Sequence, residues 1–337
     1  MTESGSHNPK PKHELVFSGV QPSGAHVHIG NYLGAMKRFV TLSTAHPTII
    51  CIVDLHSLTS VEKAEDLRQY AQSLAAAYLA IGLDPERVTL FRQSDVNQAV
   101  ELSWYLACQF PLGLLERAHA LKDARAKNQQ VNSGLMFYPI LMAADILLYK
   151  ATKVPVGADQ KQHIEMTREV AEKFNFRFGP VFPLPEPVIE EQTGVIVGLD
   201  GRKMSKSYGN YIGLFEKADD IRKKVMKIVT DSKGVDEKKD PEACNIFKLY
   251  KLFASAAEQA ALADRYRAGG MGYGHAKEEL FKAIEREVSP LRANYERWMA
   301  DPDALTEILA KGAERARAVA QKTTDEVRNA LGIGPEL

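Results

Sequence analysis

The first half of the chain alternates short apolar runs with longer amphipathic segments. Residues 49–53 form a continuous apolar run, rich in β-branched side chains, that ends at Asp54, as expected for a strand buried on both faces of a parallel sheet. The segment from about 64 to 81 has helical spacing. The other predicted strands are residues 15–17, 88–91 and 154–156. Strands and helices that alternate in this way predict an α/β fold.

A glycine turn at Gly19 follows the first strand, and a helix is predicted after Gly30. Leu33, Met36 and Val40 give that helix an apolar face. A strand, a glycine-rich turn and a helix together form a layout that cradles nucleotides, because the turn exposes backbone N–H groups and the helix N-terminus adds a partial positive charge. Glycine turns also occur for tight packing alone, and both interpretations stay open at this point.

The second half is predicted to be mostly helical. Residues 98–150 have a helical pattern, and strands almost disappear after Ser207. The helices expected there are 214–231, 243–266, 275–299 and 303–331. A length of 337 residues suggests two domains. We place them at 14–207 and 208–337, after a tail of residues 1–13 that has too few apolar groups to order.

Composition restricts the partners and the compartment. The chain has 43 basic and 43 acidic residues, so a nucleic acid would have to be met by a local basic patch. Arg222, Lys223, Lys224 and Lys227 form such a cluster on one predicted helix. The three cysteines of the chain are far apart and form no metal-binding or disulfide pattern, which fits a reducing cytoplasm. No apolar run approaches the ~20 residues of a membrane helix.

The segment from 198 to 207, GLDGRKMSKS, gathers glycines, cations and hydroxyls. Lys203 and Lys206 offer compact positive heads, and Ser205 and Ser207 add hydroxyl donors. This combination is typical of phosphate chemistry, although an isolated segment of this kind is more often a solvated basic loop.

This segment is not isolated. Together with Pro22-Ser23-Gly24 and His28-Ile29-Gly30-Asn31 it resembles the paired HIGH and KMSKS signatures of class I aminoacyl-tRNA synthetases. Three further stretches, residues 17–24, 142–149 and 154–163, are similar to those of bacterial tryptophanyl-tRNA synthetases. The resemblance extends from about residue 17 to about residue 332.

The resemblance implies a Rossmann-like parallel sheet, an inserted helical connecting region at about 55–140 that forms a homodimer face, and a C-terminal all-helical domain that binds the tRNA anticodon. The implied reaction joins L-tryptophan to ATP as tryptophanyl-adenylate with release of pyrophosphate, then transfers tryptophan to the 3′ end of tRNA(Trp). Mg²⁺ usually shares the charge of the phosphates in this family, and no metal-ligating residue of the protein is expected.

The resemblance also implies roles for individual residues. The implied catalytic residues are Lys203, Lys206, His28 and Lys122. The implied ATP-binding residues are Gln21, Pro22, Ser23, Gly30, Asn31, Gly157, Ala158, Asp159, Ile196, Lys203, Met204, Ser205, Lys206 and Ser207. The implied tryptophan-binding residues are Asp145, Phe17, Tyr138, Met142, Val154, Val156 and Gln160. We expect His28 to act as a hydrogen-bond donor and not as a proton shuttle.

Asp145 is also marked by the sequence itself. It is the only charge between Pro139 and Tyr149, so it needs a buried partner unless it points to water. A carboxylate on the helix surface is the plain alternative. The resemblance favours acceptance of the indole N–H by Asp145.

The sequence departs from the family pattern at two places. The segment 24–28, which joins the two parts of the first signature, is one residue longer than the family pattern predicts. Ala124 stands where some relatives have a second lysine after Lys122, and Arg125 or Lys127 could substitute for it.

Three other functions remain open. A tyrosyl-tRNA synthetase has the same fold, but its phenol pocket would need more polar groups than residues 139–149 offer. The second is a nucleotidyltransferase with a HIGH motif and no RNA substrate. The third is a non-catalytic paralogue that only binds RNA or tryptophan, in which the intact segment 203–207 would have no evident use.

Overall fold

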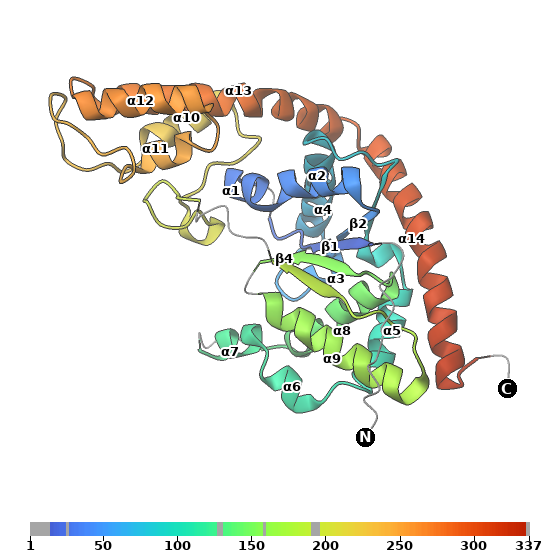
Figure 1. Cartoon of the computed structure of the whole chain (residues 1–337). Coiled ribbons are helices and arrows are strands. Elements are labelled where there is room, and N and C mark those ends of the chain that lie inside the picture. The colour runs from blue at the N-terminus through green and yellow to red at the C-terminus, as the bar shows by residue number, and fades with distance from the viewer. Residues whose placement is uncertain (1–13, 25–26, 127–130, 158–159, 190–195, 335–337) are drawn as a thin grey trace.

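The computed structural model describes residues 14–24, 27–126, 131–157, 160–189 and 196–334. At its centre is a parallel sheet of five strands in the order β3-β2-β1-β4-β5 (Figure 1). The strands are β1 (Val16–Val20), β2 (Thr48–Ile52), β3 (Val88–Arg92), β4 (Lys153–Val156) and β5 (Glu186–Ile189). Four of them confirm predicted strands. β5 was not expected, because it is a short edge strand with a proline at 187 and no fully buried side chain.

Helices cover both faces of the sheet (Figure 1). On one face lie α1 (Ile29–Asn31), the π-helical turn η1 (Tyr32–Met36), α2 (Lys37–Ala45) and α4 (Ala64–Ala80). On the other lie α5 (Gln98–Ala107), α8 (Ser133–Leu148) and α9 (Lys161–Phe178), the last of which the sequence analysis did not predict. Alternate residues of β2 serve the two layers, since Ile50 and Ile52 pack with α4 and Ile49 and Cys51 pack with α5 and α8. This layering confirms the α/β fold.

Short elements connect these layers. They are α3 (Asp54–Ser57), the 3-10 turn η2 (Gln93–Asp95), α6 (Leu112–Glu116), α7 (His119–Ala126) and the 3-10 turn η4 (Lys206–Tyr208). The helical pattern at 98–150 thus corresponds to four helices, α5 to α8, among the described residues. No helix among the described residues is long and apolar enough to cross a bilayer.

The last third of the chain is helical, as predicted. Its helices are α10 (Ala218–Met226), α11 (Asn245–Tyr250), α12 (Ala256–Ala268), α13 (Tyr273–Met299) and α14 (Pro302–Leu331). The single helix expected at 243–266 is wrong, because the chain turns between α11 and α12. Ser255 begins α12 with a capping box to Glu258, which satisfies the first N–H groups of a new helix.

α14 lies against the edge of the sheet at β3, while α10 and α11 pack against α13 on the side away from α14 (Figure 1). Gly312 allows the close approach, since a Cβ there would lie 1.8 Å from the Leu90 carbonyl oxygen. Arg315 donates to the carbonyls of Pro85 and Val88 at 2.5 and 3.2 Å. α14 therefore covers an edge strand that would otherwise expose its backbone groups.

Candidate functional site

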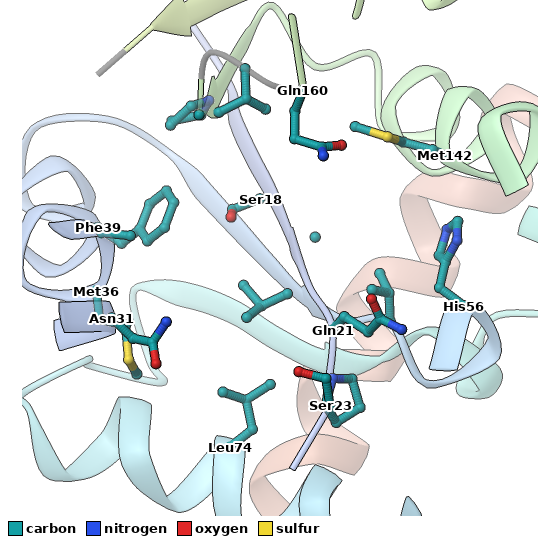
Figure 2. Close-up of a pocket in the computed structure, with 18 of the residues that line it drawn as sticks. Ser18, Gln21, Ser23, Asn31, Met36, Phe39, His56, Leu74, Met142 and Gln160 are labelled. Carbon is teal, nitrogen blue, oxygen red and sulfur yellow. The ribbon is translucent and has the colours of Figure 1, made fainter. Parts of the chain in front are cut away.

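A cavity of about 440 Å³ opens at the carboxyl ends of β1 and β4. The strand order reverses direction between these two strands, and open parallel sheets bind ligands at this point. Figure 2 shows Met36 and Phe39 on one side of the cavity and Met142 and Gln160 on the other, with Ser18 of β1 between them. The cavity thus spans both helical layers.

Asp145 lies at the α8 side of the cavity and is only 2% exposed. Its carboxylate accepts from Gln93 Nε2, at 2.9 Å to Oδ1 and 2.8 Å to Oδ2, and from His56 Nε2 at 3.0 Å to Oδ2. Phe17, Met142 and neighbouring apolar residues line the same part. A buried carboxylate in apolar surroundings is suited to accept a hydrogen bond from a flat, mostly apolar ligand.

A second polar group lies beside this apolar part. The Tyr138 hydroxyl is hydrogen-bonded to His163 Nε2, and His163 Nδ1 lies 3.0 Å from Gln160 Oε1. One neutral tautomer of His163 satisfies both contacts, with Nδ1–H donating to Gln160 and Nε2 accepting from Tyr138. His163 is 2% exposed and fixes two polar side chains that line the cavity.

The other end of the cavity is built for an anion. Residues 21–24 after β1, Asn31 at the start of the α1–α2 helical segment, Gly157 after β4 and Lys206 of η4 line it. A Cβ on Gly24 would lie 3.1 Å from Lys206 Nζ, so the absent side chain leaves room for the ammonium group. Partial burial lowers the pKa of Lys206 from its usual value.

His28 caps the helix that enters the cavity. Its Nδ1 accepts the Asn31 N–H at 3.2 Å, and Asn31 Oδ1 accepts the His28 N–H at 3.2 Å. Burial, with a smaller contribution from the positive charge of Lys206, lowers the pKa of His28 to about 4. The ring is therefore neutral at pH 7 with its proton on Nε2, so it can donate from that nitrogen.

Asn210 organises the segment that carries Lys206. Its side chain donates to Asp200 Oδ1 at 2.6 Å and to the Lys203 carbonyl at 3.1 Å, and accepts the Ser205 N–H at 2.8 Å. Ser205 in turn accepts the Ser207 N–H and begins η4. Asn210, which is 4% exposed, thus connects the loop residues on both sides of the turn through hydrogen bonds.

Comparisons with known proteins agree with this geometry. The family described as class I tRNA synthetases for tryptophan and tyrosine matches residues 10–289. A tryptophan–tRNA ligase of Fusobacterium nucleatum is 45% identical over 318 residues, which are 94% of this chain and 97% of that protein. The crystal structure of a Campylobacter jejuni tryptophanyl-tRNA synthetase with ADP and tryptophan superposes with a TM-score of 0.91 at 43% identity, covering 95% of this chain and 100% of that one.

The chain belongs to the bacterial tryptophanyl-tRNA synthetases of class I. It is a ligase of the aminoacyl-tRNA synthetase type. A tyrosyl-tRNA synthetase of Archaeoglobus fulgidus shares the fold, with a TM-score of 0.64 at 20% identity.

Within this synthetase the structure brings most of the proposed ligand-binding residues to one cavity. Those that line it are Phe17, Gln21, Pro22, Ser23, Asn31, Tyr138, Met142, Asp145, Val154, Val156, Gly157, Gln160 and Lys206. All seven residues expected to bind tryptophan are among them. Ala158 and Asp159 lie outside the described residues.

Other predicted residues lie beside the cavity without lining it. They are His28, Gly30, Ile196, Lys203, Met204, Ser205 and Ser207, on the helix cap and the loop that carries Lys206. Lys122 is exposed on α7 and does not line the cavity. The loop with the extra residue contains positions 25 and 26, which lie outside the described residues, as does Lys127. The side chain of Arg125, the other suggested substitute, also lies outside the described part of the chain.

Sequence reasoning missed Gln93, the roles of His56 and His163, and the wall made by Met36, Phe39, Leu74 and Tyr78. Met36 was predicted to lie on the apolar face of the helix after Gly30. His56 could have been found as a polar residue that closely follows the predicted strand at 49–53. Nothing in the segment around Gln93 marks it, because its importance comes from a partner that is 52 residues away along the chain.

The basic cluster on α10 is largely paired with acids. Arg222 contacts Glu278, Lys223 contacts Asp220 at 3.0 Å, and Lys224 contacts Glu216 at 2.5 Å. The pairs of Arg222 and Lys223 are exposed and break at little cost. The Lys224–Glu216 pair is partly buried, with side chains that are 30% and 20% exposed.

Proposed function

We propose that this synthetase activates L-tryptophan with ATP and then transfers tryptophan to the 3′ end of tRNA(Trp). The observation that carries the proposal is the continuity of one cavity, which joins an apolar part holding a buried carboxylate to a glycine-rich part holding a lysine. An aminoacyl-adenylate needs both parts at once, since its side chain and its phosphate lie on opposite sides of one carboxyl carbon.

In the first step a tryptophan carboxylate oxygen forms a bond to the α-phosphorus of ATP. The bond from that phosphorus to the bridging oxygen breaks, and pyrophosphate leaves with the electron pair. No protein nucleophile is needed, so catalysis consists of placing the reactants and stabilising negative charge. Lys206 and the backbone N–H groups of Ser23 and Gly24 are suited to that task.

Magnesium enters the proposal as part of the nucleotide substrate. Among the described residues no group of three or more His, Cys, Asp and Glu side chains is placed to hold a metal ion. Mg²⁺ commonly keeps several waters and binds through substrate phosphates, so the triphosphate itself can supply its ligands.

The amino-acid end of the cavity suits tryptophan. Asp145 is placed to accept the indole N–H, while Phe17 and Met142 offer apolar contact to the ring. Tyr138 and Gln160 are the proposed acceptors of the ammonium group, held by His163.

The remaining parts of the proposal concern the whole protein. The helical region after residue 207 is proposed to meet the tRNA anticodon, and the region at about 55–140 is proposed to form a homodimer. The described cysteines are unpaired, which fits a cytoplasmic location.

The decisive experiment is ATP–pyrophosphate exchange with each of the twenty amino acids. Exchange with tryptophan alone supports the proposal. Exchange with tyrosine would identify the sister enzyme, and no exchange with any amino acid would leave a binding protein. Transfer to tRNA(Trp) transcript then tests the second step.

A further inference from the structure

We infer that Gln93 is a positioning residue for amino-acid selection, which holds the Asp145 carboxylate in the orientation that receives the indole N–H. The inference rests on the proposed function and extends it to a residue that does not line the cavity. Gln93 lies in η2, directly after β3, and is 1% exposed.

The contacts place Gln93 behind the carboxylate. One amide nitrogen donates to both oxygens of Asp145, at 2.9 and 2.8 Å. The amide oxygen of Gln93 accepts the Leu55 N–H at 3.2 Å. Gln93 thus connects the backbone at the start of α3 to a side chain in the last turn of α8.

The backbone contact decides which way the amide faces. A backbone N–H can only donate, so the group of Gln93 that faces Leu55 must be the oxygen. The nitrogen is then forced toward Asp145, where an ionised carboxylate can only accept. A reversed amide would lose all three hydrogen bonds, so the side chain has one acceptable orientation.

Asp145 depends on this arrangement because it has little other compensation. Among the described residues its ion-pair partner is His56, and no lysine or arginine pairs with it. The His56 side chain is 11% exposed and lines the cavity, so it lies on the ligand side. Gln93 is the partner that a ligand does not touch, and it fixes the carboxylate whether or not the cavity is filled.

The test compares L-tryptophan with benzothienylalanine, in which sulfur replaces the indole N–H. Gln93→Met keeps the length of the side chain and removes its donor. We expect it to raise KM for tryptophan by about 10- to 100-fold in ATP–pyrophosphate exchange, the range for losing hydrogen bonds to a charged group, with KM for ATP unchanged. KM for benzothienylalanine should change less, so the preference for tryptophan should fall by at least about tenfold.

Two further variants make the result interpretable. Gln93→Glu keeps the shape and the acceptor for Leu55 but replaces the donor with a second carboxylate, so it should also lose the tryptophan preference. If Gln93→Met melts early, this variant decides the test. Gln98→Met is the matched control, because Gln98 bonds to Gln321 at an exposed position on α5 and should behave like the parent.

The outcomes separate the inference from the function on which it rests. If the parent protein does not activate tryptophan, the proposed function is wrong. A parent that activates tryptophan, with folded Gln93 variants that keep its preference over benzothienylalanine, would overturn the inference alone. An equal rise in KM for both amino acids would also overturn it, since that is the behaviour of a merely structural residue.

Discussion

Among the described residues Lys206 is the lysine that lines the cavity, and Gly24 leaves the space for its ammonium group. We expect Lys206→Ala to slow adenylate formation by ~100-fold, the cost of losing one contact to charge that develops in the transition state. Tryptophan binding should stay near that of the parent, because Asp145 and Met142 are untouched. Single-turnover kinetics and equilibrium binding give the two numbers. Equal losses in both would contradict the role assigned to Lys206.

His28 should make stability depend on pH. Its pKa falls from 6.5 in the unfolded chain to about 4 in the folded one, so between these values only the unfolded chain binds the proton. His28 therefore does not lower the free energy of unfolding above pH 6.5. Below that pH the free energy of unfolding decreases as the pH falls toward 4, because protonation stabilises only the unfolded chain. The total loss is up to about 3 kcal/mol, at 1.36 kcal/mol per pKa unit.

His28→Asn is the variant for this test, since asparagine also caps helices but does not titrate. Urea denaturation at several pH values should show the parent losing stability faster than the variant between pH 6.5 and 4. Parallel curves would mean that His28 is not held neutral by the fold.

At the scale of single residues, the sequence predicted residues whose polarity differs from that of their neighbours along the chain. Asp145 stands alone in an apolar helix, and the structure shows the buried partners that this contrast demanded. Gln93 could not be predicted, because its two partners come from α3 and α8 and meet only in the folded chain. The role of Lys122 stays a prediction, since this residue is exposed on α7 and does not line the cavity.

At the scale of elements, continuous apolar runs were reliable and edges were not. β2 is buried along its whole length and was predicted within one residue at each end. β5 was missed because it has little burial to mark it, and α9 was not predicted although it packs on α8. The division of residues 243–266 into α11 and α12 was missed because helical spacing alone does not reveal a break, which here is marked by the capping box at Ser255.

The contact between α14 and β3 yields a prediction at this scale. Gly312→Ala would place a methyl group 1.8 Å from the Leu90 carbonyl oxygen, and backbone on both sides resists a shift. We expect a loss of about 3 kcal/mol in the free energy of unfolding, as for overpacking at a rigid contact.

Gly274→Ala on α13 is the matched control, since a Cβ at that helical glycine meets nothing within 4 Å. It should be neutral or slightly stabilising. Urea denaturation of both variants checks the comparison, and similar stabilities would show that α14 can move away from β3 at little cost.

At the scale of the whole molecule, α13 connects the C-terminal helices to the helical segment at residues 29–45, from which Asn31, Met36 and Phe39 line the cavity. Glu287 on α13 accepts from the Tyr32 hydroxyl and from Lys37, both at 2.7 Å. Tyr295 further along stacks on Phe215, with ring centroids 4.0 Å apart. The boundary predicted at 207 stays a prediction, and the helices beyond it contact the sheet domain along both α13 and α14.

The last prediction concerns a second copy of the chain. Leu58, Val100, Trp104 and Phe137 are 61%, 51%, 69% and 48% exposed, and all four line a second cavity of about 700 Å³. Exposed apolar groups gathered in one place mark an interaction surface. They lie within the region that resembles the family's dimer face, so we expect a dimer at micromolar concentration and a shift toward monomer in Trp104→Glu.

The same surface lies next to the amino-acid site, because His56 and Tyr138 line both cavities. Loss of the partner should therefore raise KM for tryptophan more than KM for ATP. Phe176→Glu is the control, since Phe176 is 92% exposed on α9 but does not line the second cavity. Sedimentation velocity and ATP–pyrophosphate exchange test both effects. A parent protein that is monomeric and fully active would show that these apolar side chains serve another partner, because a homodimer would then be unnecessary for the site to work.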